Sequence, residues 1–250
     1  MSELLLVWRS LLAGISQVFR ATTTTTAAKE KMNTPTPEPL ESLLTFDNVR
    51  RVLQARGYVF FDNDKPNNLN IVGVRSDTNG TNQFDDYLVV AFRNADLEQS
   101  VKVYPVTTDP GKYWLENPRN PKGTAILVPG QYRSTWKIGK HQGKYEALVQ
   151  RRLVKVYRDA DRDDVIDYEH LQDSVDEGHF GINIHRSNPY GESYRVDRWS
   201  AGCQVFQSIR DYDEFMEICR ESAEMYGNGF TYTLVTEIDL RRHLATESTI

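Results

Sequence analysis

The sequence of 250 residues predicts a mainly β fold. Short runs rich in Val, Ile, Tyr, Phe and Thr recur along most of the chain, and clusters of Gly, Pro, Asn and Asp separate them. Only two stretches of the folded part carry the apolar spacing of a helix. Because short strands joined by tight turns are typical of antiparallel architectures, we expect a β-sandwich or barrel with two short flanking helices.

Residues 1–42 are predicted to form an N-terminal segment outside the main fold. Residues 1–20 alternate apolar clusters with Arg9 and Arg20, as an amphipathic helix does, and Arg9 interrupts the apolar stretch that a secretory signal would need. Residues 21–40 are rich in Thr and Pro and offer almost nothing to bury. We therefore expect an amphipathic segment followed by a linker.

The first of the two helices is expected between Thr45 and Gly57, where Thr45 or Asp47 can cap the start and Gly57 can end it. The second is expected over residues 211–226, where Asp211 and Glu214 have the spacing of a capping box. Its apolar stripe includes Cys219, which is therefore interpreted as an inert core residue.

Seven β-rich runs account for most of the remaining sequence. They are Asn70–Val74, Tyr87–Phe92, Val101–Val106, Thr124–Val128, Ala147–Tyr157, Gly181–His185 and Phe230–Ile238. We expect residues 43–84 to form an extension packed on a main domain of residues 85–240, with a tail at residues 241–250.

Charge and composition exclude several classes of protein. Lys and Arg number 30 and Asp and Glu 35, which gives a net charge of −5, and the basic residues are scattered. A nucleic-acid-binding chain normally shows a basic patch, and a membrane-spanning helix needs about 20 apolar residues, so we expect neither. The two cysteines do not make a disulfide framework.

Cys203, in the run Ser200-Ala201-Gly202-Cys203, is the candidate nucleophile. Gly202 and its small neighbours leave room for a substrate carbonyl to approach both the sulfur and the backbone amides of a turn. Taken alone, this segment also fits a cysteine that merely packs in the core. A working thiol needs a base, which the rest of the sequence must supply.

His185 is the candidate base. It ends the run Gly181–His185 just before the turn-forming residues 187–191, and strand ends present side chains to a site. A hairpin-like connection between this run and Cys203 would bring the imidazole to the thiol. His185 and Cys203 are 18 positions apart (203 − 185).

Ile184-His185, this spacing and the run Ser200–Cys203 together resemble the L,D-transpeptidase catalytic domain, whose signature is His-Gly, a loop, then Ser-x-Gly-Cys. The likeness covers roughly residues 85–240. It implies an L,D-transpeptidase-like fold and acyl transfer on peptidoglycan stem peptides through a Cys203 thioacyl intermediate, with His185 as base. It also implies that Ser200 supports the histidine or the loop, that the amides of Gly202 and Cys203 form the oxyanion hole, and that no cofactor is needed.

Two positions depart from the family signature. Arg186 stands where the family has Gly, and Gln204 stands close to where it has Arg, so recognition of a substrate carboxylate is expected to be rearranged. We take Arg186, Gln204, Arg198, Trp199 and His141 as the candidate substrate-binding residues.

Two other functions share these features. A cysteine peptidoglycan hydrolase, such as an L,D-carboxypeptidase, an endopeptidase or a phage lysin, would pass through the same acyl-enzyme. An inactive cell-wall-binding module would instead use a groove of aromatic rings, for which the candidates are Tyr113, Trp114, Tyr132, Trp136, Tyr190, Tyr194 and Trp199. Each of the three functions places the chain at the cell envelope or outside the cytoplasm, including the case of a phage-encoded protein.

An acidic stretch provides the one candidate for a metal ion. Its alternate carboxylates, typical of a Ca²⁺ loop, are Asp159, Asp161, Asp163 and Asp167. However, Asp164 occupies the position where such loops need Gly, and His170 the position where they need a bidentate Glu. We therefore favour a solvated acidic turn and expect no metal, and His141, His185 and Cys203 lack the spacing of a zinc site.

Overall fold

The computed structural model describes residues 38–78 and 81–245. The expected amphipathic segment and all but the end of the linker lie outside these residues. The described part contains eleven β-strands and four α-helices, which confirms the prediction of a mainly β fold. None of its helices is both long enough and apolar enough to cross a membrane.

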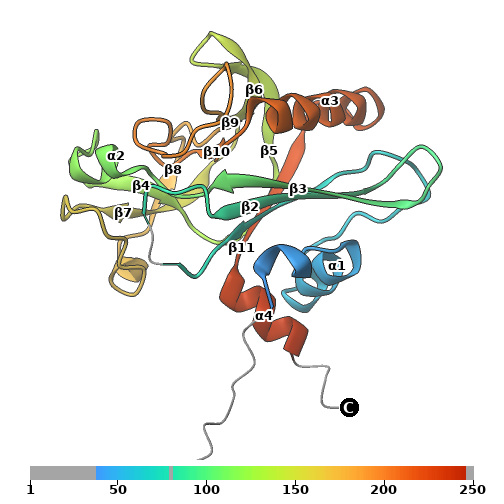
Figure 1. Cartoon of the computed structure of the whole chain (residues 1–250), viewed down its shortest axis with the longest axis horizontal. Helices are drawn as coiled ribbons and strands as arrows, with labels where there is room; N and C mark the ends of the chain where they lie inside the picture. The colour runs from blue at the N-terminus through green and yellow to red at the C-terminus, as the bar shows by residue number, and fades with distance from the viewer. Residues whose placement is uncertain (1–37, 79–80, 246–250) are drawn as a thin grey trace, which may run out of the picture. The chain divides into compact units, whose positions relative to one another are not determined.

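Eight strands close into a barrel in the order β1-β11-β5-β6-β9-β10-β3-β2 (Figure 1). Neighbouring strands are antiparallel except for β1 with β11 and β9 with β10. A sandwich is not confirmed. The barrel strands are β1 (Asn70–Arg75), β2 (Asp86–Arg93), β3 (Gln99–Thr107), β5 (Gly130–His141), β6 (Tyr145–Gln150), β9 (Ile184–Arg186), β10 (Gln204–Phe206) and β11 (Phe230–Thr236).

A second sheet of three strands has the order β4-β7-β8. Its strands are β4 (Thr124–Leu127), β7 (Val154–Asp159) and β8 (Asp176–Gly178). The expected single run from Ala147 to Tyr157 is therefore divided between β6 of the barrel and β7 of this sheet. The chain leaves one sheet and enters the other at residues 151–153.

The four α-helices are α1 (Phe46–Ala55), α2 (Lys112–Glu116), α3 (Ile209–Tyr226) and α4 (Glu237–Ala245), with 3-10 turns η1 (Leu40–Leu43) and η2 (His170–Asp173). Thr45 caps α1 as predicted, since its hydroxyl accepts from the backbone N–H of Asn48 at 3.2 Å. The capping box predicted for α3 is wrong, because the helix begins at Ile209 and Glu214 instead accepts from Lys102 and Tyr104.

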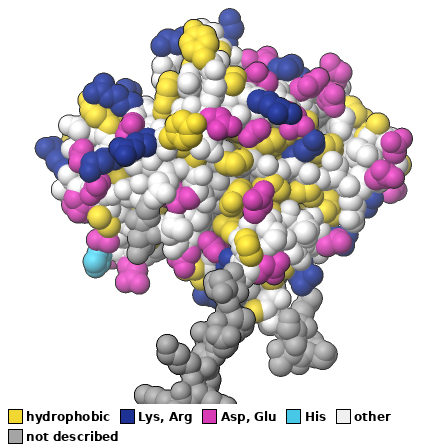
Figure 2. Space-filling view, in the orientation of Figure 1, with side chains coloured by type: hydrophobic (Ala, Val, Ile, Leu, Met, Phe, Trp, Pro, Cys, Tyr) yellow, Lys and Arg dark blue, Asp and Glu magenta, His cyan; other side chains and the backbone are white. Residues whose placement is uncertain are grey.

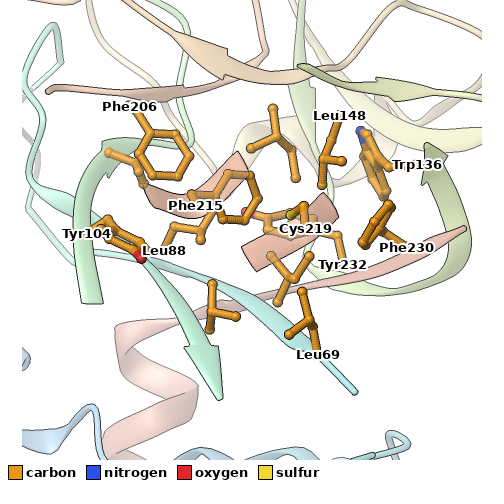
Figure 3. Close-up of a cluster of buried hydrophobic side chains, with 14 of the residues drawn as sticks. Leu69, Leu88, Tyr104, Trp136, Leu148, Phe206, Phe215, Cys219, Phe230 and Tyr232 are labelled. Carbon is orange, nitrogen blue, oxygen red and sulfur yellow. The ribbon is translucent and has the colours of Figure 1, made fainter. Parts of the chain in front are cut away.

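Two apolar cores lie on the two sides of the barrel wall. The interior core joins inward-facing strand residues to α3, whose Phe215 and Cys219 are fully buried beside Phe206 and Tyr232 (Figure 3). The outer core is covered by α1 and α4. Since β1 has a core on each side, all six of its residues are buried.

The domain boundaries differ from those expected. The extension of residues 43–84 contains β1, which pairs with both β2 and β11 and is thus part of the barrel. Residues 241–245 of the expected tail belong to α4.

On the face of the molecule in Figure 2, acidic and basic side chains are interspersed.

Candidate active site

A cavity of about 530 Å³ lies against β9 and the segment that leads into β10. Its wall also includes residues of α2, β4 and β7 and the end of β5. Of the predicted site residues, those that line it are Cys203, His185, His141, Arg198 and Trp199. The cavity therefore brings the proposed nucleophile and base to one surface.

The register of β9 and β10 determines which side chains face this cavity. Gln204 pairs with Ile184 and Val205 pairs with His185, and the two strands run parallel. The expected hairpin-like connection is therefore wrong, because the chain must cross over between the strands. Strand alternation turns Ile184 and Gln204 inward, where both are 0% exposed, and leaves His185 on the opposite side.

Cys203 immediately precedes β10, and its thiol is held by the backbone of the neighbouring segment. Sγ donates to the carbonyl of Gly181 at 3.4 Å and accepts from the N–H of Asn183 at 3.4 Å. Burial raises the pKa of the thiol to about 11, while the Asn183 N–H opposes that shift. At neutral pH Cys203 is a thiol, and within the described residues it makes no hydrogen bond to an imidazole.

Hydrogen bonds at Nδ1 fix the orientation of the His185 ring. Its Nδ1 lies 2.8 Å from the carbonyl oxygen of Arg186 and 3.1 Å from the hydroxyl of Tyr145. Because a carbonyl only accepts, Nδ1 carries the proton and the lone pair is on Nε2. Burial first, then His141, lowers the pKa of His185 to about 3, so the ring is neutral.

The turn before Cys203 requires glycine. Gly202 has φ +114°, and a Cβ there would lie 2.2 Å from the carbonyl oxygen of Ala125. Ser200 Oγ donates to the carbonyl of Cys203 at 2.8 Å and accepts from the N–H of Gly202 at 3.2 Å. Ser200 thus supports the loop.

The two amides expected to form the oxyanion hole differ in their hydrogen bonds. The N–H of Gly202 is already used by Ser200. The N–H of Cys203, in contrast, has no hydrogen-bond partner among residues 38–78 and 81–245. Of the two expected amides, that of Cys203 is therefore the one left without a partner in this part of the chain.

Two of the expected substrate contacts lie outside the cavity lining. The Gln204 side chain is inside the barrel, where it donates to the carbonyl of Gly202 at 3.4 Å and accepts from Tyr232 at 2.8 Å. Arg186 stacks on the ring of Tyr145, with its guanidinium carbon 4.1 Å from the centroid. Gln204 supports the turn before Cys203 from within the barrel.

Three cavity residues carry features that the sequence did not reveal. The ring of His141 stacks on His185, with centroids 4.0 Å apart and planes at 29°. Arg198 lies 3.8 Å from the centroid of Tyr113, and Arg119 lies 4.0 Å from that of Trp114. Both guanidinium groups are thus oriented by rings on α2.

Gln150, at the end of β6, organises the segment that holds the thiol. Its side-chain oxygen accepts from three successive backbone N–H groups, those of Phe180, Gly181 and Ile182, at 2.9–3.1 Å. This cradle fixes the Gly181 carbonyl that receives the Cys203 thiol. The sequence offered only a polar residue inside the predicted β-rich run Ala147–Tyr157, which is too common a feature to identify such a role.

Several other expected groups lie elsewhere. Of the aromatic residues proposed for a sugar groove, Trp136 is buried in the barrel core, while Tyr190 and Tyr194 are exposed outside the cavity lining.

In the acidic stretch, Asp159 Oδ1 is buried without a hydrogen-bond partner, and burial raises the pKa of this carboxyl to about 7. The described residues contain no group of three or more His, Cys, Asp or Glu arranged to hold a metal ion.

Comparison with known proteins gives no match, whether to a protein-family model, a curated protein or a solved structure. The function must therefore be inferred from the residues of the cavity.

Proposed function

We propose that this chain catalyses cysteine-dependent acyl transfer on peptidoglycan stem peptides, as L,D-transpeptidases do. One observation carries the proposal: Cys203 and His185 line a single cavity, and the base has its Nδ1 engaged by a carbonyl. That arrangement leaves Nε2 of a neutral imidazole to accept a proton. The proposal places the chain at the cell envelope or outside the cytoplasm.

In the resting state the Cys203 thiol and the His185 imidazole are both uncharged. A bound substrate displaces the thiol from the Gly181 carbonyl, His185 Nε2 accepts its proton, and Sγ attacks the peptide carbonyl. The N–H of Cys203 stabilises the oxyanion. When the C–N bond breaks, the imidazolium returns the proton to the leaving amine, and Cys203 remains as a thioester.

Charge in the cavity supports a peptide that carries free carboxylates. Arg119 and Arg198 line the wall, and among the described residues no Asp or Glu does, although the whole chain has a net charge of −5. Arg158 also lines the wall, but its guanidinium is paired with Asp176 at 3.2 Å. Arginine pairs well with carboxylate groups. Because Arg119 and Arg198 are stacked on rings, they lose less side-chain freedom when a carboxylate binds.

Hydrolysis is the first alternative, because water can replace the acceptor amine at the same thioester. Incubating purified peptidoglycan with the protein and measuring the fragments by mass separates the two reactions. New crosslinks would identify a transferase and shortened stem peptides a hydrolase, and Cys203→Ala should abolish either change whereas Cys219→Ala should not. Unaltered peptidoglycan would contradict the proposal and favour the binding module.

A further inference from the structure

Asn183 fixes the proton position on His141. The Oδ1 of Asn183 accepts from the backbone N–H of Gln150 at 3.0 Å, so its amide nitrogen must be the atom that faces the ring. That nitrogen lies 3.0 Å from His141 Nδ1. Since an amide NH₂ only donates, Nδ1 of His141 is the acceptor and its Nε2 carries the proton.

The stacked partner has the opposite tautomer. His185 Nδ1 donates to the carbonyl of Arg186, and its Nε2 carries the lone pair. The stacked pair therefore has a donor, the Nε2–H of His141, and an acceptor, the Nε2 of His185. The ring centroids are 4.0 Å apart. Two stacked imidazolium rings at this separation would repel each other, so the stack favours a state in which at least one ring is neutral.

The second nitrogen of each ring, Nε2, is free of hydrogen bonds to the described protein residues. Among those residues, Asp159 Oδ1 is the one fully buried side-chain nitrogen or oxygen atom without a partner. The two Nε2 atoms are therefore accessible, and both residues line the cavity.

We propose that His141 is the hydrogen-bond donor of this histidine pair: Asn183 holds it as the Nε2–H tautomer, and it donates to a carbonyl or carboxylate oxygen of the bound ligand beside the acceptor His185. Asn183 is a positioning residue, because it also donates its backbone N–H to the Cys203 thiol. A neutral imidazole that polarises a carbonyl through a fixed N–H is an established catalytic device. The identity of the ligand rests on the proposed function, whereas the tautomer does not.

The tautomers can be measured by nitrogen-15 NMR of the histidine rings in the full chain. We expect protonated Nε2 in His141 and protonated Nδ1 in His185. Asn183→Asp replaces the donor amide with an accepting carboxylate, so His141 should acquire a proton on Nδ1 while the Nδ1–H of His185 is retained. Protonated Nδ1 in wild-type His141, or no change in Asn183→Asp, would overturn the proposal.

Ligand binding tests the donor role separately. Titration with N-acetylglycine, which carries a carbonyl and a carboxylate, should shift the His141 Nε2 resonance in wild type and bind at least about tenfold more weakly to His141→Phe. His141→Gln retains an N–H donor and should recover part of this binding, whereas His170→Phe, outside the cavity lining, should match wild type. Equal binding by folded His141→Phe would contradict the donor role even if no peptidoglycan activity is found.

Discussion

The two sides of the β9–β10 pair use adjacent residues for different purposes. On the inward side, Ile184, Gln204 and Phe206 are 0% exposed, and the only polar group among these side chains has its hydrogen bonds satisfied by protein. On the outward side, His185 and Cys203 line a cavity. Strand alternation thus places cavity-lining residues one step along the chain from residues of the barrel core.

The two cysteines show the same contrast. Burial raises the pKa of both thiols, yet Cys219 is 0% exposed within the interior core while Cys203 reaches the cavity. The difference that matters is access to a ligand and to His185. Neither thiol has a lowered pKa in the resting state, so the pKa does not distinguish the two cysteines.

The largest effect should come from the inward side. Phe206→Ala removes a fully buried ring that packs on Phe215 at 5.0 Å between centroids. We expect the free energy of unfolding to fall by about 3–5 kcal/mol, measured by denaturant titration. Cys203→Ala on the outward side should change it by less than about 1 kcal/mol, and equal losses would break the division between the two sides.

On the outward side, Gly202→Ala should reduce acylation of Cys203 at least about 100-fold. The new Cβ would meet the backbone of Ala125 at 2.2 Å, in a φ region that alanine rarely adopts, so the turn must move. Single-turnover acylation kinetics measures this loss. Gly191→Ala is the matched control in the same connection, because its added Cβ meets nothing within 4 Å. A similar loss in both variants would remove the special role of Gly202.

The pH dependence of alkylation sharpens the contrast between the thiols. With a pKa of about 11, the thiolate fraction of Cys203 increases about tenfold per pH unit from pH 7 to 10. The rate of iodoacetamide labelling at Cys203 should follow that slope, and Cys219 should remain unlabelled until the protein unfolds. A plateau at neutral pH would mean that Cys203 is instead a preformed thiolate.

The smallest effect tests how the inward side supports the outward one. Tyr232→Phe leaves Gln204 Oε1 without its donor, so we expect a loss of about 1–3 kcal/mol in unfolding free energy and a reduction of a few fold in acylation. Tyr132→Phe, which also removes a hydroxyl hydrogen bond but at the carbonyl of Val128, should lower stability without slowing acylation. Slower acylation in Tyr132→Phe alone would reverse this assignment.

The sequence predicted those features of the fold that depend on residues close together along the chain. The cap at Thr45, the burial of Cys219 and most β-rich runs follow from spacing that the chain itself displays. The twelve-residue β5 was not predicted, because polar residues interrupt its pattern and its pairing with β6 and β11 sets its conformation.

The candidate site divides in the same way. The motif proposed Cys203 and His185 as the catalytic pair, and both residues line one cavity. The inward orientation of Gln204, the ring stack of His141 and the cradle made by Gln150 each depend on contacts between segments distant in sequence. A single sequence contains no local signal for such contacts.

The central claim, that Cys203 is acylated with the help of His185, can be tested most directly by incubating the protein with a carbapenem and mapping the adduct by peptide mass spectrometry. We expect one covalent adduct per chain, on the peptide that contains Cys203, absent in Cys203→Ala and formed at least about 100-fold more slowly in His185→Ala. An adduct on Cys219, or an unchanged rate in folded His185→Ala, would contradict the claim.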